Sequence, residues 1–443
     1  MGIVMTFASI RFLYCFAGFL IIYFLTPARF RRYVLLIGSI AFLAANSIKG
    51  AVIAAIFVPI NYFLARKAYN EYDPIISARR SAALNLIVLC IFKVTGFIPV
   101  GASFYIFTYV AYLIDVGRHD IKYESNFIDY ANYALFFPRL LMGPIARYKD
   151  SREDIKRPTI SAENVQYGLE SFILGFAMKI VLADRLVHLQ REVERIGIDC
   201  VSTSCAWLTA FTFALRLYLD WQSYCLMASG IAKVLGFDLP INFNYPHMAK
   251  SVSEFYRRWH MTLTSWFKDY IYIPMGGSRK GKIRTVFNIL FIWLLTGLWH
   301  GLTVNFILWG LSLGVFVAIE HLGLRKLLDK MRVLPHIYVI FVITATFALF
   351  ATNGLNNIAL YFDKLFPVNG IEPSMMPGDT LIYLQKFWPY LLGGILCAFP
   401  YPERILHKYG KKWYGATILA GIFWVTIYIL WKNGNSPFMY MNF

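Results

Sequence analysis

Leu294–Asn305 reads LLTGLWHGLTVN and lies near the centre of a long apolar segment, Val286–Ile319. This segment of 34 residues contains no Asp, Glu, Lys or Arg, and His300 is its one titratable side chain. A continuous helix at ~1.5 Å per residue would run ~51 Å, which exceeds the ~30 Å hydrocarbon core of a bilayer. We therefore predict two helices with a break at Gly301–Asn305.

The position of His300 indicates a functional site, because ionisable side chains inside apolar membrane segments are costly and usually serve a function. Trp299 provides a broad apolar wall beside it. Gly297 and Gly301 have no side chain, so a backbone or a substrate can approach closely there. The alternative is a histidine that only forms a hydrogen bond to a neighbouring helix.

The composition is that of an α-helical membrane protein. Hydrophobic residues make up 58% of the 443 residues, charged residues make up 15%, and the mean hydropathy is +0.53. Apolar runs recur along almost the whole chain, so we predict an all-α polytopic fold of about ten to twelve transmembrane or re-entrant helices. We expect these helices to form a single domain over residues 1–443. No internal repeat is evident, which argues against a transporter built from two matching halves.

The formal net charge of +18 comes largely from short basic clusters between the apolar runs. This pattern is typical of cytoplasmic loops and of attraction to anionic lipid head groups. It does not indicate nucleic-acid binding, because no recognition module accompanies the charge. The six cysteines form no zinc-ligand pattern, so no metal site is predicted.

Hydropathy and breaker residues predict where the helices lie. Arg66–Arg80 is expected to be a polar loop, and Asn132–Ile145, which proline and glycine interrupt, a re-entrant or interfacial segment. Ser251–Gly277 has aromatic residues at helical spacing, which predicts an amphipathic interfacial or re-entrant helix or, alternatively, a plain surface anchor. Spans are expected near 7–26, 33–48, 51–65, 82–97, up to about 116, 165–182, 206–235, 337–352, 382–399 and 413–431.

His260 and His300 are the two histidines that fall in membrane-embedded surroundings. An apolar site disfavours the charged imidazole, so each ring can accept a proton from a hydroxyl and later return it to a leaving thiolate. Acyl transfer from a thioester to an alcohol needs that sequence of proton transfers. No serine or cysteine lies in a nucleophile motif, which favours direct transfer. The basic residues nearby could hold the phosphates of a donor such as coenzyme A.

Two motifs make the resemblance to a known family specific. RRWHMTLTSWFKDYIYIPMGG (Arg257–Gly277) and GLWHG (Gly297–Gly301) are similar to the two signatures of the membrane-bound O-acyltransferase superfamily. Within it the chain resembles the branch that acetylates bacterial exopolysaccharides such as alginate. Further similarity is found in GASFYIFTYVAYLIDV (Gly101–Val116), FFPRLLMGPIARYKD (Phe136–Asp150) and YLDWQSYCLMASGIAKVLGF (Tyr218–Phe237).

The resemblance implies roles for individual residues. His300 matches the essential histidine, a general base, and His260 matches a second polar position that orients substrate or donor. In the family the two histidines meet in a central tunnel that crosses the protein. The motif positions expected to build this tunnel and hold the donor are Arg258, Trp259, Trp266, Asp269, Tyr270 and Trp299.

The resemblance also implies a reaction and a location. An acyl group, most simply acetyl, would pass from a cytoplasmic thioester such as acetyl-CoA to a hydroxyl of a cell-surface or exported polysaccharide. Transfer could be direct or through an extracytoplasmic acetyltransferase partner, in the bacterial cytoplasmic membrane and without a permanently bound cofactor. The alternatives are D-alanyl transfer toward teichoic acid from a carrier protein, acylation of lipid or protein, and a non-catalytic acyl-group transporter.

Overall fold

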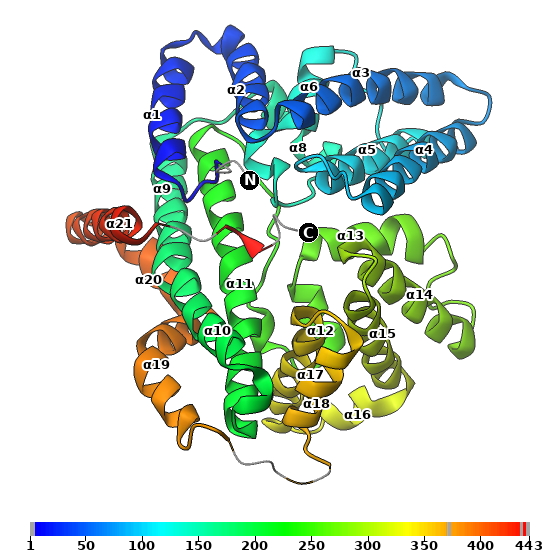
Figure 1. The fold of residues 1–443 in the computed structure, drawn as a ribbon. Helices are drawn as coiled ribbons and strands as arrows, with labels where there is room; N and C mark the ends of the chain where they lie inside the picture. Colours follow the sequence, from blue (N-terminus) through cyan, green and yellow to red (C-terminus); the bar gives the residue numbers. More distant parts are fainter. Residues whose placement is uncertain (1–4, 369, 371–373, 435–436, 440–443) are drawn as a thin grey trace. The chain divides into compact units, whose positions relative to one another are not determined.

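The computed structural model describes residues 5–368, 370, 374–434 and 437–439, and all regular secondary structure in these ranges is helical (Figure 1). Residue contacts group the chain into two compact units. Among the described residues, the first unit comprises 5–176, 224–241, 409–434 and 437–439, and the second comprises 177–223, 242–368, 370 and 374–408. The all-α prediction is confirmed, and the single domain and the central tunnel stay predictions.

Several helices are suited to crossing a membrane, which confirms a polytopic membrane protein. A bent pair, α19 (Asp379–Cys397) and α20 (Tyr401–Tyr409), would form a further span with an angle of 74°. Two shorter helices, α1 (Ile10–Leu25) and α5 (Ala102–Gly117), are also apolar. Six helices in the described part of the chain are long and apolar enough by themselves, namely α3 (Ile48–Asn70), α4 (Pro74–Thr95), α14 (Lys282–His300), α15 with its extension (Val304–Leu328), α17 (Leu334–Ala351) and α21 (Trp413–Asn433).

In the first unit, α3, α4 and α5 lie side by side (Figure 1). The polar loop predicted at Arg66–Arg80 is wrong, because α3 continues to Asn70 and α4 begins at Pro74. Proline fits the first turn of a helix, where its missing N–H would have no partner, and Asp73 caps this end. The unit also contains α1, α2 (Arg31–Asn46), α6 (Phe127–Leu135), α7 (Phe137–Leu140), α8 (Tyr148–Lys156), α9 (Ala162–Ala177), α21 and the C-terminal part of α11 (Thr203–Val234).

In the second unit, α14 and α15 form a hairpin that packs against α17. The predicted break is confirmed, since α14 ends at His300 and α15 begins at Val304. A Cβ on Gly297 would lie 2.4 Å from the carbonyl oxygen of Phe306. This glycine therefore lets α15 pack closely on α14. Gly301 is needed for the same reason, because a Cβ there would lie 2.6 Å from the ring of Phe306 in α15.

The segment Ser251–Gly277 differs from the single amphipathic helix that we expected. Its helix breaks after Arg258, so that α12 (Val252–Arg258), α13 (Met261–Phe267) and a π-helical turn at Lys268–Tyr272 follow one another. The break centres on His260, which has left-handed backbone dihedrals of φ 44° and ψ 52°. This conformation is uncommon for a residue other than glycine, and it often marks a functional position.

Candidate active site

His260 is held in a buried pocket by Asn242 and Trp221. Its side chain is 3% exposed, and its ring lies edge-on to Trp221 with 4.2 Å between the centroids. Nδ1 of His260 lies 3.0 Å from Oδ1 of Asn242. The main chain fixes the same geometry, because the Met261 N–H donates to the carbonyl oxygen of Asn242 over 2.9 Å.

These contacts determine which ring nitrogen of His260 carries the proton. Oδ1 of Asn242 also accepts from Thr262, at 3.3 Å from its main-chain nitrogen and 2.9 Å from its hydroxyl, so the atom facing His260 is an oxygen. An amide oxygen can only accept, and Nδ1 must therefore be protonated in the neutral ring. Nε2 is then a lone-pair acceptor, and it is buried without a hydrogen-bond partner among the described residues.

Burial, together with the neighbouring His300, holds the pKa of His260 well below its usual value. Desolvation penalises the charged imidazolium, so the ring stays neutral at ordinary pH. A neutral ring with an available nitrogen lone pair can accept a hydrogen bond or a proton from a hydroxyl group.

His300 is surrounded by aromatic side chains. It is 6% exposed, and its ring centroid lies 4.6 Å from Trp299, 4.9 Å from Trp309 and 5.1 Å from Phe350. α14 ends at His300, while α15 and α17 supply the facing rings. The fold therefore excludes bulk water from this imidazole on several sides.

The two histidines line one cavity of about 310 Å³ within the second unit. Its walls are mainly apolar and come from α12, α13, α14 and α15, with Trp221 from α11. Two cations, Arg257 and Lys268, line it as well, and its lining contains no carboxylate. Such a cavity favours an anionic group at the cationic part and an uncharged reacting group beside the histidines.

Of the six residues predicted to build the tunnel and hold the donor, one lines this cavity. Trp259 lines the cavity, whereas the guanidinium of Arg258 pairs with Glu254, with 2.8 Å between Nη2 and Oε1. Trp299 packs against His300 outside the lining, and the rings of Trp266 and Tyr270 lie 5.4 Å apart, also outside it. Asp269 is likewise outside the lining. Their roles in binding the donor stay predictions.

A buried carboxylate anchors α12, the helix that precedes His260. Glu320 is 2% exposed and accepts from the main-chain nitrogen atoms of Val252 at 2.6 Å and Ser253 at 2.9 Å. It also accepts from the Ser253 hydroxyl over 2.6 Å. The first turn of a helix has no intrahelical partners for its N–H groups, so Glu320 stabilises this end and joins α12 to the end of α15.

Sequence reasoning missed several residues that build the site. Asn242 and Glu320 are distant from His260 in the sequence, and neither lies in a motif that predicts the contact. Arg257 is adjacent to Arg258, which we predicted to bind the donor. Arg257 and Lys268 are 11 residues apart, which is close to three helical turns, so helical spacing could have placed both on one face of Ser251–Gly277.

Comparison with known proteins shows the family of this chain. The family model described as "MBOAT, membrane-bound O-acyltransferase family" matches residues 67–362, a range that contains both histidines and the cavity lining. The chain belongs to the membrane-bound O-acyltransferase family. The predicted enzyme class, an O-acyltransferase of the exopolysaccharide-acetylation branch, is confirmed.

Curated members of the family are similar along most of the chain. The probable alginate O-acetylase of Pseudomonas putida is 31% identical over 86% of this chain and 84% of its own length. The peptidoglycan O-acetyltransferase of Helicobacter pylori is 28% identical over 81% of this chain and 78% of its own length. The teichoic acid D-alanyltransferase of Streptococcus thermophilus is 26% identical over 51% of this chain and 57% of its own length.

The Asn242–His260 pair predicts a change in the pH profile of this O-acyltransferase. An Asn242→Asp variant keeps the acceptor for Nδ1 but places a carboxylate there, which favours the charged imidazolium and raises the pKa of His260. We predict that the neutral ring is the working form, so when the pH is lowered this variant should lose activity at a higher pH than the parent protein does. The measurement is the rate of acyl transfer against pH.

An Asn242→Leu variant is the matched control, because it removes the acceptor without adding charge. It should lower activity at every pH and leave the acidic limb of the profile where it was. An unshifted profile in Asn242→Asp would show that His260 does not need to be neutral.

Proposed function

We propose that this protein transfers an acetyl group from a cytoplasmic thioester to a hydroxyl group of an exported or cell-surface polysaccharide. The observation that carries the proposal is the cavity of about 310 Å³ that brings His260 and His300 together with two cations and no carboxylate. Two relatives, a probable alginate O-acetylase and a peptidoglycan O-acetyltransferase, favour a polysaccharide acceptor.

The size and charge of the cavity favour acetyl as the group transferred. The cavity has about twice the ~150 Å³ volume that holds one benzene molecule, which suits a small acyl group and the end of a pantetheine arm. A D-alanyl group carries an ammonium, and this lining offers it two cations and no carboxylate. The phosphates of coenzyme A, in contrast, can form ion pairs with Arg257 and Lys268.

The reaction needs one proton to move twice. The hydroxyl oxygen of the acceptor attacks the thioester carbonyl carbon, and His300 takes the hydroxyl proton as the carbon–oxygen bond forms. The carbon–sulfur bond then breaks, and the proton passes to the thiolate, so that an ester and a free thiol leave. Nε2 of His260 accepts a hydrogen bond that orients the acceptor hydroxyl or a donor amide.

The distribution of charge favours a donor side and an acceptor side. Arg279 and Lys280 precede α14, Lys282 is its first residue, and the segment after α15 contains further basic residues. The connection between α14 and α15, at 301–303, and the segment after α17, at 352–354, carry no charge. By the positive-inside rule, α14 begins in the cytoplasm and crosses ~28 Å to His300, toward the other face.

The acceptor approaches from that uncharged face in this proposal. A hollow of about 830 Å³ there is lined by Leu302–Val304 and Asn353–Asn357, directly after His300 and after α17. Amides suit the hydroxyl groups of a polysaccharide, because each amide offers both a donor and an acceptor. The proposal includes a second route, in which the acceptor is the hydroxyl of an extracytoplasmic partner that passes the acetyl group on. The host membrane is then the bacterial cytoplasmic membrane.

The two cations provide the test of this proposal. Purified protein should form acetyl esters on a bacterial polysaccharide from acetyl-CoA, and Arg257→Glu or Lys268→Glu should raise the KM for acetyl-CoA. Loss of one charge-assisted contact is worth ~1.5–3 kcal/mol, or about 10- to 100-fold. The value of kcat should change much less, since neither residue touches the reacting atoms.

Arg279→Glu is the matched control, because Arg279 lies in a basic exposed loop outside the cavity lining. It should leave the KM for acetyl-CoA unchanged. Equal KM values in all variants would exclude donor binding at this cavity. Transfer from a D-alanyl carrier protein but not from acetyl-CoA would favour the D-alanyltransferase alternative.

A further inference from the structure

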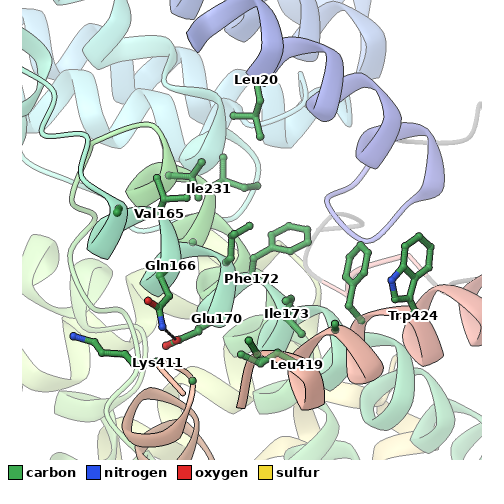
Figure 2. Close-up of a pocket in the computed structure, with 18 of the residues that line it drawn as sticks. Leu20, Val165, Gln166, Glu170, Phe172, Ile173, Ile231, Lys411, Leu419 and Trp424 are labelled. Atoms are coloured by element: carbon green, nitrogen blue, oxygen red, sulfur yellow. Dashed lines mark hydrogen bonds between the residues drawn. The ribbon is translucent and has the colours of Figure 1, made fainter. Parts of the chain in front are cut away.

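A second large cavity lies in the first unit, and the proposed reaction makes no use of it. We call it the α21 cavity; it has a volume of about 910 Å³ and lies among α1, α9, the C-terminal end of α11, and α21. Figure 2 shows that Leu20, Phe172 and Leu419 from three of these helices lie around it. Apolar side chains form most of the wall.

The α21 cavity needs an apolar occupant. Protein interiors pack as densely as organic crystals, and apolar cavities of this kind are not filled by water. α21 is long and apolar enough to cross a membrane, and Trp424 at the edge of the cavity is 66% exposed, so lipid chains can reach it. By comparison with the ~150 Å³ that holds one benzene molecule, 910 Å³ has room for about 36 carbon atoms, as in two lipid acyl chains.

Three charged residues, Lys411, Lys412 and Glu170, line the α21 cavity. Figure 2 shows Lys411 and Glu170 on the same side of it. Nζ of Lys411 lies 2.6 Å from Oε1 of Glu163, and Glu170 accepts from Gln166 over 2.9 Å. Glu163 lies outside the lining but pairs with Lys411, so with Lys412 and Glu170 the formal charges at this end of the cavity cancel. A zwitterionic head group matches this balance better than an anionic one.

Lys412 has the position that a phosphate requires. It precedes the first residue of α21, and no carboxylate in the described ranges forms a salt bridge with it. No side chain caps this end of α21, so the N–H groups of the first turn are available. A lysine ammonium and the N-terminus of a helix both favour a phosphate.

We propose that the α21 cavity holds one phosphatidylethanolamine molecule. Its two acyl chains lie among α1, α9 and α21, its phosphate lies at Lys412 and the first turn of α21, and its ammonium lies at Glu170. The lipid fills the space that side chains leave open and so attaches α21 to the rest of the first unit. This inference is independent of the proposed acetyl transfer.

The test is to purify the full chain in a mild detergent from membranes that contain both phosphatidylethanolamine and phosphatidylglycerol. Native mass spectrometry and lipid extraction should find about one phosphatidylethanolamine per chain, as the cavity volume predicts. Ala420→Trp fills the cavity from α21 and should reduce this lipid to the background level. Lys412→Glu should also lower it, because the phosphate would then meet a carboxylate.

Two matched controls separate this site from general lipid contact. Ala55→Trp adds the same side chain to an exposed position of α3, and Lys432→Glu reverses a charge at the other end of α21. Both should retain the lipid. The proposal is overturned if Ala420→Trp keeps the full amount, if phosphatidylglycerol is retained instead, or if a protein occupies the cavity.

Discussion

His300→Ala should abolish acetyl transfer, with a loss of about 10²- to 10⁴-fold, the usual contribution of a positioned general base. The loss follows from the surroundings of the ring, because Trp309 and Phe350 face it and neither of these side chains can accept a proton. The measurement is the initial rate of ester formation by the purified variant at saturating donor.

A second variant distinguishes lost chemistry from lost folding. His300→Gln keeps a polar side chain of similar reach but cannot accept a proton near neutral pH, so it should be as inactive as His300→Ala and bind the donor normally. His188→Ala, at an exposed position of α10 (Asp184–Ile196), should retain full activity. A His300→Ala variant within a few-fold of the parent rate would make this histidine structural.

Glu320→Ala should lower both stability and activity, although Glu320 does not line the catalytic cavity. In the parent protein, the buried carboxylate of Glu320 accepts hydrogen bonds from three donors in Val252 and Ser253. The substitution removes this acceptor. The bond from Val252 is buried and the two from Ser253 are partly buried. An unsatisfied buried donor costs ~1–3 kcal/mol, so we expect a loss of stability in that range. The melting temperature in detergent and the transfer rate measure the two effects.

A conservative substitution at Glu320 separates the effect of its acceptor oxygen from the effect of its negative charge. Glu320→Gln keeps one acceptor oxygen in place and should recover part of the stability and activity that Glu320→Ala loses. Glu194→Ala, an exposed glutamate of α10 in the same unit, should have neither effect. Parent-like melting and activity in Glu320→Ala would mean that α12 is held by its other contacts alone.

The long apolar helices and the break after His300 could be predicted because they depend on composition and on the thickness of a bilayer. A run of 34 residues without charge cannot be one span, and Gly301 follows the last residue of α14. The helix at Pro74 could not be predicted from polarity. Its start depends on Asp73, whose side chain caps the first turn.

The two histidines could be identified from the sequence, but the groups that orient them could not. The contact of His260 with Asn242 crosses 18 residues, and the contact of Glu320 with Val252 crosses 68. No helical or strand periodicity connects positions so far apart. The left-handed backbone of His260 likewise depends on this loop pairing, and so the expected helix over Ser251–Gly277 is interrupted there.

Our central claim is that the acyl carbonyl reacts in the cavity that His260 and His300 share. A cryo-EM map of the protein with an acetyl-CoA analogue, in which a methylene group replaces the thioester sulfur, tests it most directly. We predict the carbonyl of the analogue beside the two imidazole rings and its phosphates near Arg257 and Lys268. Analogue bound elsewhere, with this cavity empty, would contradict the account.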